Sequence, residues 1–346
     1  MLAKIVPCMA ILMMVGSTLA QAAPDWTKGI PTEVVPAVQG AARGAPPMTS
    51  VLENNNWVRV NGCAKSIAAG AVDQVVVAGC VGSGAAGGIF TWRAQGADGR
   101  WEPEPAGTQM HRFGWDNGLR QYAIPAAASW LAINGEFAST GFGDTGGRVY
   151  AIGSDALLYS RPFNPGVHPK KDQFWNHFAG TTHGTSPLQI TAIAGSSSDD
   201  RLWMISAEPN GAGGNKIYYA ESCRKENDLA TGRCWREAGG AAQKVAVGRD
   251  VWVTSTDGSI FRRDGSNWAK IDGCARDIAA NGKHLYVVGC DWANGEGTVY
   301  RRAGNTWMNI GQKAKTLAVD VAGNAWLVRA NGDIYRRKPT PPGVIH

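Results

Sequence analysis

The sequence is poor in charge and histidine, and it has no long hydrophobic run beyond its first 22 residues. Charged residues make up 18% of the 346, and the net charge of +6 includes no run of five or more basic residues, so nucleic-acid binding is not expected. The six histidines are scattered, without the spacing of a zinc site. A phosphate loop ending in Lys-Ser/Thr and a Gly-x-Ser-x-Gly elbow are both missing. The commonest enzyme signatures are therefore absent.

The first 22 residues resemble a secretory signal. Lys4 gives a positive start, Ile11 to Val15 an apolar core, and Ala20 to Ala22 a small-residue cleavage site. The apolar run is too short to cross a bilayer, and no later stretch is long enough. We expect a chain that is secreted or periplasmic after cleavage near Ala22. Residues 23–56 read as a Pro/Gly-rich N-terminal arm, and residues 339–346 as a loose tail.

The cysteines support export. Of seven, Cys8 lies in the signal, and the other six fall into local pairs. Each of two pairs is centred on a predicted turn between two β-runs, where an antiparallel hairpin brings Cα atoms to a distance that suits a disulfide. The third closes a smaller loop. We predict the bridges Cys63–Cys80, Cys274–Cys290 and Cys223–Cys234, which indicate an oxidising compartment. Free buried thiols are the alternative.

What the sequence has in abundance is glycine and tryptophan, 45 and 14 residues, arranged in a repeat. Each unit opens with Trp, continues through short β-branched runs and ends in an Ile/Val-aromatic-Arg-Arg run, as in residues 268–302. The spacing is 33 residues from Trp235 to Trp268 and 39 from Trp268 to Trp307. Four short β-runs in such a repeat are typical of a propeller blade.

The repeat predicts an all-β chain, a six-bladed β-propeller of four-stranded antiparallel blades over residues 57–338. Blade openings are expected at Trp57, Trp130, Trp175, Trp235, Trp268 and Trp307. Residues 101–129 fit the repeat poorly and are interpreted as an insertion, with a degenerate seventh blade as the alternative. Type I′ hairpin turns are predicted at Asn281-Gly282, Asp257-Gly258 and Asn331-Gly332, because both residue types tolerate positive φ.

The motif Trp-x-x-Ile-x-Gly-x-Ala, followed by Ile-Ala, Val-Trp-Val and Gly-x-Ile-Tyr-Arg-Arg, resembles the tectonin repeat. It stands most clearly at residues 268–302 and 307–337, and more loosely at 235–263 and 57–93. The resemblance implies a six-bladed propeller and lectin-like recognition of microbial surface glycans, including methylated sugars and lipopolysaccharide. Other members of that family are protein-interaction scaffolds. The Arg-Arg ending is lost in the second and third blades, which suggests fewer than six working sites.

The repeated tryptophans are expected to fill the space between neighbouring sheets. One arginine of each pair is expected to stack on a repeated Trp or to form a salt bridge, with anion or sugar binding as the alternative. Three tryptophans break the pattern: Trp92, Trp115 and Trp292. Of these, Trp292 lies in a polar loop with Asp291 and Asn294. An aromatic face beside carboxylate and amide groups suits a pyranose ring, so these five residues are the candidate carbohydrate contacts, and a Trp folded back onto its blade is the alternative.

The sequence therefore predicts a carbohydrate-binding propeller, whose partner is a cell-surface glycan or lipopolysaccharide. A scaffold for a protein partner is the second hypothesis. A glycan-active enzyme is the third, although no paired carboxylate motif is visible. No cofactor and no catalytic residue is expected. Oxygen atoms of Asp291, Asn294 and Glu296 leave a calcium site as an alternative, but their spacing is not that of an EF-hand loop.

Overall fold

The structure is a computed structural model that describes residues 57–80, 89–95, 98–103, 108–112, 119–123, 130–134, 148–152, 156, 158–162, 176–177, 182–183, 186–187, 189–195, 202–211, 213–220 and 235–337. Several predictions lie outside these residues. They are the signal segment 1–22, the arm 23–56, the tail 339–346, the blade opening at Trp175, the candidate contact Trp115 and the pair Cys223–Cys234.

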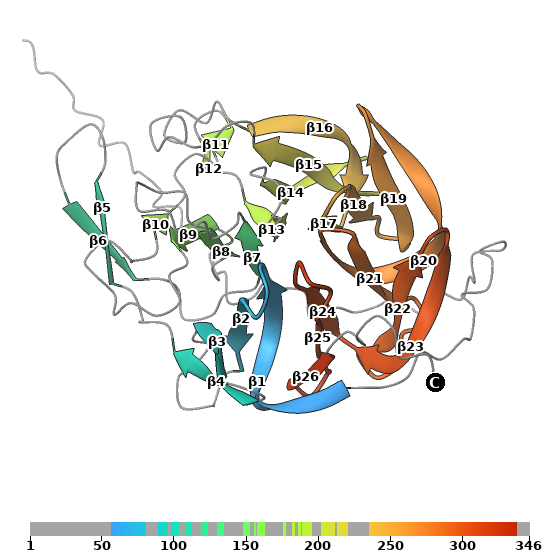
Figure 1. Cartoon of the computed structure of the whole chain (residues 1–346). Coiled ribbons are helices and arrows are strands. Elements are labelled where there is room, and N and C mark those ends of the chain that lie inside the picture. The colour runs from blue at the N-terminus through green and yellow to red at the C-terminus, as the bar shows by residue number, and fades with distance from the viewer. Residues whose placement is uncertain are drawn as a thin grey trace, which may run out of the picture. The chain divides into compact units, whose positions relative to one another are not determined.

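The described secondary structure consists of antiparallel β-strands (Figure 1). One seven-stranded sheet contains, in spatial order, β24 (Thr316–Val319), β25 (Ala325–Val328), β26 (Asp333–Arg337), β1 (Trp57–Ala69), β2 (Val75–Gly79), β3 (Ile89–Gln95) and β4 (Asp98–Pro103). A second contains β17 (Lys244–Val247), β18 (Val251–Thr254), β19 (Ser259–Asp264), β20 (Asn267–Asn281), β21 (His284–Gly289), β22 (Gly297–Ala303) and β23 (Thr306–Ala314).

Two sheets have four strands. One contains β10 (Asn176–His177), β9 (Leu158–Pro162), β8 (Arg148–Ile152) and β7 (Trp130–Asn134), and the other β13 (Ile190–Ala194), β14 (Trp203–Asn210), β15 (Gly214–Ala220) and β16 (Trp235–Ala242). Two hairpins complete the set: β5 (Thr108–Arg112) with β6 (Leu119–Ala123), and β11 (Thr182–His183) with β12 (Ser186–Pro187). Within the described ranges, no helix is long and apolar enough to cross a membrane. The all-β prediction is confirmed.

Each seven-stranded sheet consists of two four-stranded groups that share one long strand. Residues 57–60 of β1 pair with β26, whereas residues 64–69 pair with β2, and the register shifts between Val60 and Cys63. Strand β20 divides in the same way between β19 and β21. Counted over the described residues, the sheets contain six four-stranded groups, and two of the junctions between consecutive groups are single continuous strands.

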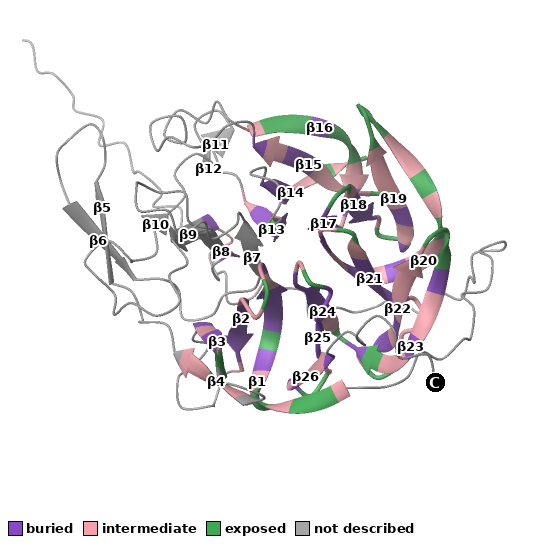
Figure 2. Ribbon diagram, in the orientation of Figure 1, coloured by how far each residue is buried: buried purple, intermediate pink, exposed green. Residues whose placement is uncertain are grey.

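The first strands of the six groups contact one another in a closed series. Strand β1 contacts β7, β7 contacts β13, β13 contacts β17, β17 contacts β20, β20 contacts β24, and β24 contacts β1. Two of these strands, β17 and β24, contain short buried apolar runs, Val245-Ala246-Val247 and Leu317-Ala318-Val319 (Figure 2). The β-branched and small residues of each run suit a strand packed on both faces.

The repeated Trp lies in the fourth strand of a group, not in its first. Trp268 in β20 pairs across from β19, so it completes one group before the chain continues into the next. Trp101, in β4, holds the equivalent place in the group of β2 and β3. Trp130 differs from these, because it lies in β7, which pairs with β8 as the first strand of its sheet, in agreement with the expected opening. Trp101, which the sequence pattern places in an insertion, therefore occupies the position of the repeated Trp in its four-stranded group.

The Trp and Gly of the repeat motif meet between consecutive groups. A Cβ added to Gly240 would lie 2.9 Å from the indole of Trp268, and one added to Gly62 would lie 3.0 Å from that of Trp101. Both glycines have positive φ, +80° and +128°. The glycine therefore leaves room for the indole of the following group, which explains why the two residue types recur together.

The predicted disulfides Cys63–Cys80 and Cys274–Cys290 are confirmed, each with a Cα–Cα distance of 5.5 Å. Each lies over a glycine in a turn of the preceding group. A Cβ added to Gly258 would lie 2.5 Å and 2.6 Å from the sulfur atoms of Cys290 and Cys274, and one added to Gly332 would overlap the first disulfide. The disulfides thus pack between groups as well as closing their own hairpins.

The predicted type I′ turns are wrong at these glycines. Gly258 and Gly332 have φ of +83° and +88°, but Asp257 and Asn331 are not among the residues with positive φ. The amide of Gly258 donates to Ser255 O at 3.0 Å, and that of Gly332 to Arg329 O at 3.0 Å. Each turn therefore ends on its glycine, so only one positive φ is needed.

Candidate functional site

The candidate site is the loop between β21 and β22, residues 290–296. Ala293 and Glu296 form an isolated antiparallel bridge with backbone hydrogen bonds of 2.8 Å and 3.1 Å. Between them Asn294 and Gly295 have φ of +56° and +81°. Two positive φ values in a two-residue turn are what Asn-Gly favours. This Asn-Gly turn was missed in the sequence, although the dipeptide itself was a sufficient signal.

Asp291 closes the base of the loop. Its Oδ1 accepts a hydrogen bond from the Thr298 amide at 2.9 Å, and its Oδ2 accepts one from the Thr298 hydroxyl. The residue is exposed, but both carboxylate oxygens are engaged by the strand that follows the loop. Asp291 therefore holds the loop, and any ligand would share its oxygens with Thr298.

Glu296 ties the loop to the next group. Its Oε1 accepts hydrogen bonds from Arg329 Nε and from the Ala330 amide, both at 2.8 Å. Burial opposes ionisation of this carboxyl, but the bonds from Arg329 and Ala330 outweigh burial and lower the pKa of Glu296. The carboxylate is therefore ionised at neutral pH and fixed by two donors, which leaves little freedom for the loop to move.

Besides Asp291 and Ala293, the loop presents Asn294 and part of Trp292 to solvent. Trp292 is half-buried and packs against the cluster that contains Leu317 and Leu327, whereas Asn294 is exposed. Among the described residues, neither the Trp292 indole nitrogen nor the Asn294 amide has a hydrogen-bond partner. A partly exposed aromatic ring beside an open amide, on a loop held at both ends, can stack on a sugar ring and bond its hydroxyls without first being ordered.

Trp92 lies elsewhere, in a different core cluster. Its side chain is 6% exposed, and its ring centroid is 5.1 Å from that of Trp101 and 5.3 Å from that of Trp326, both edge-on. The structure therefore does not bring Trp92 together with the 290–296 loop, and it leaves little of this ring open to a ligand. The assignment of Trp92 and Trp292 as sugar contacts stays a prediction.

The stacking of arginine on a repeat-opening tryptophan is confirmed for Arg263 and Arg302, whereas Arg336 of the third pair lies over Trp326, which opens no repeat. The guanidinium carbon of Arg263 lies 5.0 Å from the ring of Trp268, and that of Arg302 lies 5.0 Å from the ring of Trp307. The residues of each pair face one another across neighbouring strands. Burial lowers the pKa of Arg302, with smaller effects from Asp272 and Arg262. These arginines serve the contacts between strands rather than an open site.

The described part of the chain contains no group of three or more His, Cys, Asp or Glu side chains close enough to hold a metal ion. Asp291 and Glu296 also spend their oxygens on Thr298 and Arg329. The calcium alternative thus gains no support from these two carboxylates, and the expectation of no cofactor stays a prediction.

Comparison with family models finds no match, and comparison with curated sequences finds no relative. Solved structures with a similar arrangement exist. One is the lectin SapL1 in complex with α-methyl fucoside, 14% identical, covering 78% of this chain and 89% of the lectin with a TM-score of 0.44. Another is the Cps50 (Swd1) β-propeller domain of Myceliophteria thermophila. It is 12% identical, and the match covers 82% of this chain and 99% of that domain with a TM-score of 0.46. A third is streptogramin B lyase. It is 10% identical, and the match covers 81% of this chain and 96% of the lyase with a TM-score of 0.40. At these TM-scores the likenesses assign neither a family nor a function.

Proposed function

We propose that the chain is a secreted or periplasmic carbohydrate-binding protein built as a six-bladed β-propeller of the tectonin type. The six four-stranded groups would be the blades, and the closed series of contacts between their first strands supports this reading. Residues 57–60 of β1 would form the fourth strand of the last blade. The two disulfides fit an oxidising compartment, in line with the secretory signal expected in residues 1–22.

The observation that carries the proposal is the constrained 290–296 loop. Glu296 and Asp291 fix the loop, while the half-buried Trp292 ring and the exposed Asn294 amide remain available. Pyranose recognition needs an apolar platform and groups that bond hydroxyls, and a preformed pair of this kind avoids the entropy cost of ordering a loop. Weak sites repeated on one scaffold would gain avidity on a glycan-covered surface.

The test is a glycan array with the mature chain, including bacterial and O-methylated glycans, with and without Ca²⁺. We expect saturable binding to one sugar class, lost in Trp292→Ala and retained in part by Trp292→Phe, which keeps an aromatic face. Asn294→Gly removes the amide but accepts the positive φ of +56°. It should weaken binding about 10-fold, the worth of one well-made hydrogen bond.

Val72→Ala is the matched control, because Val72 is 54% exposed and lies outside the loop. Its binding should equal that of the unmodified chain. If glycans bind equally well to the Trp292→Ala variant, the site is elsewhere. A blank array from folded, disulfide-bonded protein contradicts the carbohydrate proposal.

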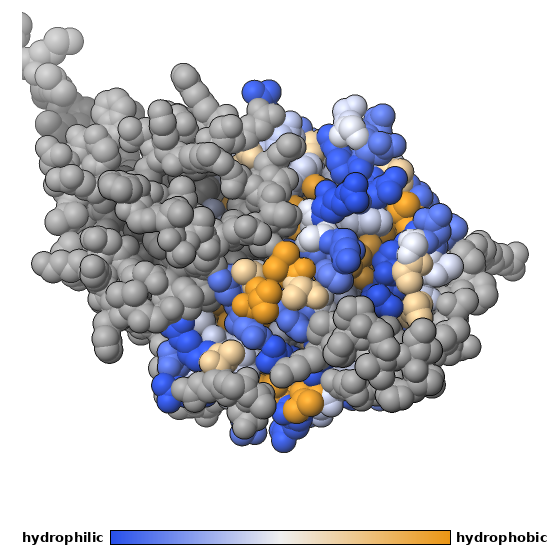
Figure 3. All heavy atoms as spheres, viewed as in Figure 1, coloured by the Kyte–Doolittle hydropathy of each residue, from blue (hydrophilic) through white to orange (hydrophobic). Residues whose placement is uncertain are grey.

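A protein-interaction scaffold is the alternative function. It predicts a contiguous exposed apolar surface. In the part of the chain that the structure describes, the exposed large hydrophobic residues are Val58 and Val72. Figure 3 shows hydrophobic spheres gathered over a small area near β1, β2 and β24, bordered by hydrophilic ones. Two exposed valines and a small hydrophobic area favour this function less than the loop favours glycan binding.

A further inference from the structure

Three basic residues stand at equivalent places where the first strands of three groups begin. Lys65 and Arg276 lie at the register shifts of β1 and β20, between Ala64 and Ser66 and between Ala275 and Asp277. Lys315 directly precedes β24, and its amide donates to Val328 O at 2.8 Å. Strand β24 contacts both β1 and β20, so the three strands are neighbours.

Hydrogen bonds between β20 and β24 place Arg276 and Lys315 at the same position along these two strands. The Asp277 carboxylate accepts hydrogen bonds from the Leu317 amide, at 3.1 Å, and from the Thr316 side chain. Arg276 and Lys315 each directly precede a member of this network, so they flank the same junction. Lys65 likewise precedes a buried polar residue, Ser66.

The positive charge of these three residues is not neutralised within the described structure. Lys65 and Lys315 are exposed and Arg276 is half-buried, and none of them forms a salt bridge among the described residues. The nearest carboxylate in sequence, Asp277, is 4% exposed and already interacts with Lys244 of β17, whose charge adds to the same region. Gathering such charges without a counterion is unfavourable, so the place suits an anionic ligand.

Three further acidic residues, Glu296, Asp333 and Asp257, already have partners. Glu296 is bound by Arg329 and Asp333 by Arg59, at 2.8 Å and 2.6 Å. Asp257 accepts hydrogen bonds from the Ser259 amide at 2.9 Å and from the hydroxyl groups of Ser255 and Ser259.

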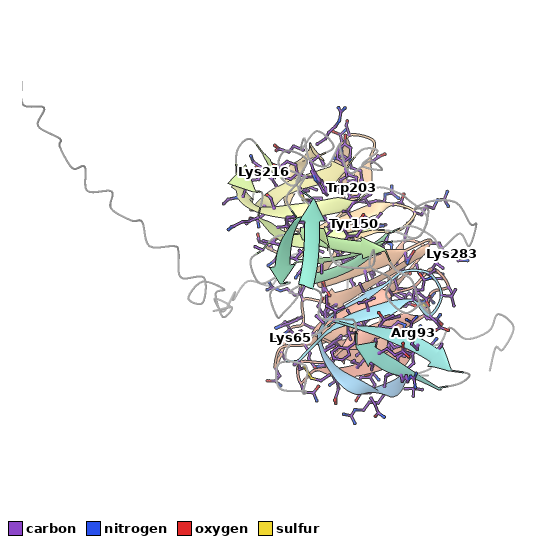
Figure 4. All side chains as sticks on the ribbon, turned by 90° about the vertical axis from the view of Figure 1, so that its left-hand side faces the viewer. Lys65, Arg93, Tyr150, Trp203, Lys216 and Lys283 are labelled. Atoms are coloured by element: carbon purple, nitrogen blue, oxygen red, sulfur yellow. A yellow bond between two sulfur atoms is a disulfide. The ribbon has the colours of Figure 1, made fainter. Side chains whose placement is uncertain are left out.

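The three cations lie on the same side as the 290–296 loop. Arg276 is two residues beyond Cys274, whose disulfide partner Cys290 directly precedes Asp291, and Ala275 pairs with Gly289. The turn between β20 and β21 lies at the other end of these strands. Figure 4 labels Lys65 and Lys283, a residue of that turn, on opposite sides of the view.

We propose that Lys65, Arg276 and Lys315 form a site for an anionic oxygen group of a glycan, a carboxylate, phosphate or sulfate. The inference rests on the proposed carbohydrate binding and specifies its ligand class as an acidic glycan. An arginine fork bonds two oxygens of such a group at once, and the two lysines supply point charges around it. The sugar ring would rest on the Trp292 side of the site.

The test compares two acidic polysaccharides with the neutral methyl ester of one of them. Polygalacturonate, its methyl ester and dextran sulfate are titrated against the full mature chain by calorimetry at two salt concentrations. Lys65→Gln/Arg276→Gln/Lys315→Gln removes the site. Arg249→Gln/Lys270→Gln/Lys283→Gln is the matched control, because it removes the same charge from three exposed residues outside the site. Unchanged thermal melts establish that both triple variants are folded.

We expect polygalacturonate or dextran sulfate to bind at least about 10-fold more tightly than the methyl ester. The site variant should lose this advantage, whereas the control variant should stay within about 2-fold. A preference for only one of the two acidic polymers would tell a carboxylate site from a sulfate or phosphate site. Equal losses of affinity for the acidic polymers in both triple variants would indicate general charge attraction and contradict a specific site.

The outcome separates this inference from the proposed function. If the chain binds the methyl ester or a neutral glycan as tightly as the acidic polymers, the anion site fails and carbohydrate binding stands. If it binds neither acidic nor neutral glycans, the proposed function fails, and the inference with it.

Discussion

Trp92 holds in β3 the cross-strand position that Arg263 holds in β19. Trp92 lies opposite Trp101, as Arg263 lies opposite Trp268. Each side chain also reaches a tryptophan of the preceding group, at 5.3 Å and 6.0 Å. An indole thus replaces a guanidinium in the same packing arrangement, which accounts for the tryptophan that breaks the repeat in this group of strands.

Trp92→Ala should lower the free energy of unfolding by about 3–5 kcal/mol, the usual cost of truncating a buried aromatic residue. Trp292→Ala should cost less, because Trp292 is only half-buried. Urea unfolding followed by circular dichroism measures both. Should Trp92→Ala keep its stability and yet abolish glycan binding, Trp92 is a ligand contact and not a core residue.

Gly258→Ala should destabilise the protein more than Gly265→Ala does. Both glycines have positive φ, +83° and +57°, where alanine costs about 1–2 kcal/mol. Nothing lies within 4 Å of a Cβ on Gly265, whereas one on Gly258 meets the sulfur atoms of Cys274 and Cys290. The difference between the two melting temperatures therefore isolates packing against the disulfide. Equal decreases in melting temperature would show that packing of Gly258 against the disulfide does not affect stability.

Cys274→Ala/Cys290→Ala should cost about 3 kcal/mol, since the bridge closes a loop with a sequence separation of 16. Thermal unfolding with and without dithiothreitol checks this. The reductant should lower the melting temperature of the unmodified chain more than that of the variant. A reductant effect of the same size in both proteins contradicts a role for this bridge.

Glu296→Gln should weaken the protein in a pH-dependent way. Because the pKa of Glu296 is lowered in the folded state, its stabilising effect is present above the unfolded value of about 4.3 and is lost as pH falls through the folded pKa. The stability difference between the unmodified chain and the variant should therefore be largest near pH 7 and shrink in acid. Denaturant unfolding at several pH values measures it, and a constant difference would refute the ion pair with Arg329.

For Asp277→Asn, the pH dependence of the stability difference should run in the opposite direction to that of Glu296→Gln. Burial raises the pKa of Asp277, although Lys244 and the hydrogen bonds from Thr316 and Leu317 act against that rise. The folded state therefore holds a proton more readily than the unfolded state, and the contribution of Asp277 to stability improves as pH falls through its raised pKa. The variant should lack this dependence while its oxygen still accepts from the Leu317 amide. An unchanged pH profile would contradict the assignment.

The sequence predicted those features whose causes are local. The positions of Cys63 and Cys80 around one turn were sufficient to predict their bridge, and the short β-branched run Val75-Val76-Val77 predicted strand β2. The stacking of Arg302 on Trp307 followed from their places in the repeat.

Features that depend on contact between repeats were not predictable from spacing. The offset between the sequence repeat and the four-stranded group arises because β20 serves two groups, which depends on hydrogen bonds to two different neighbours. The bond between Glu296 and Arg329 joins residues 33 positions apart. The local prediction of type I′ turns failed where Gly258 and Gly332 contact disulfides of the following group.

The sharing of β1 between two groups has a consequence for the order of folding. Residues 57–60 are synthesised long before their partner strand β26. The last group therefore cannot acquire its fourth strand until the chain has been made through residue 337, and pairing at such a separation is slow. A chain that lacks residues 57–61 would expose β26 as an open edge to which a second chain can add a strand.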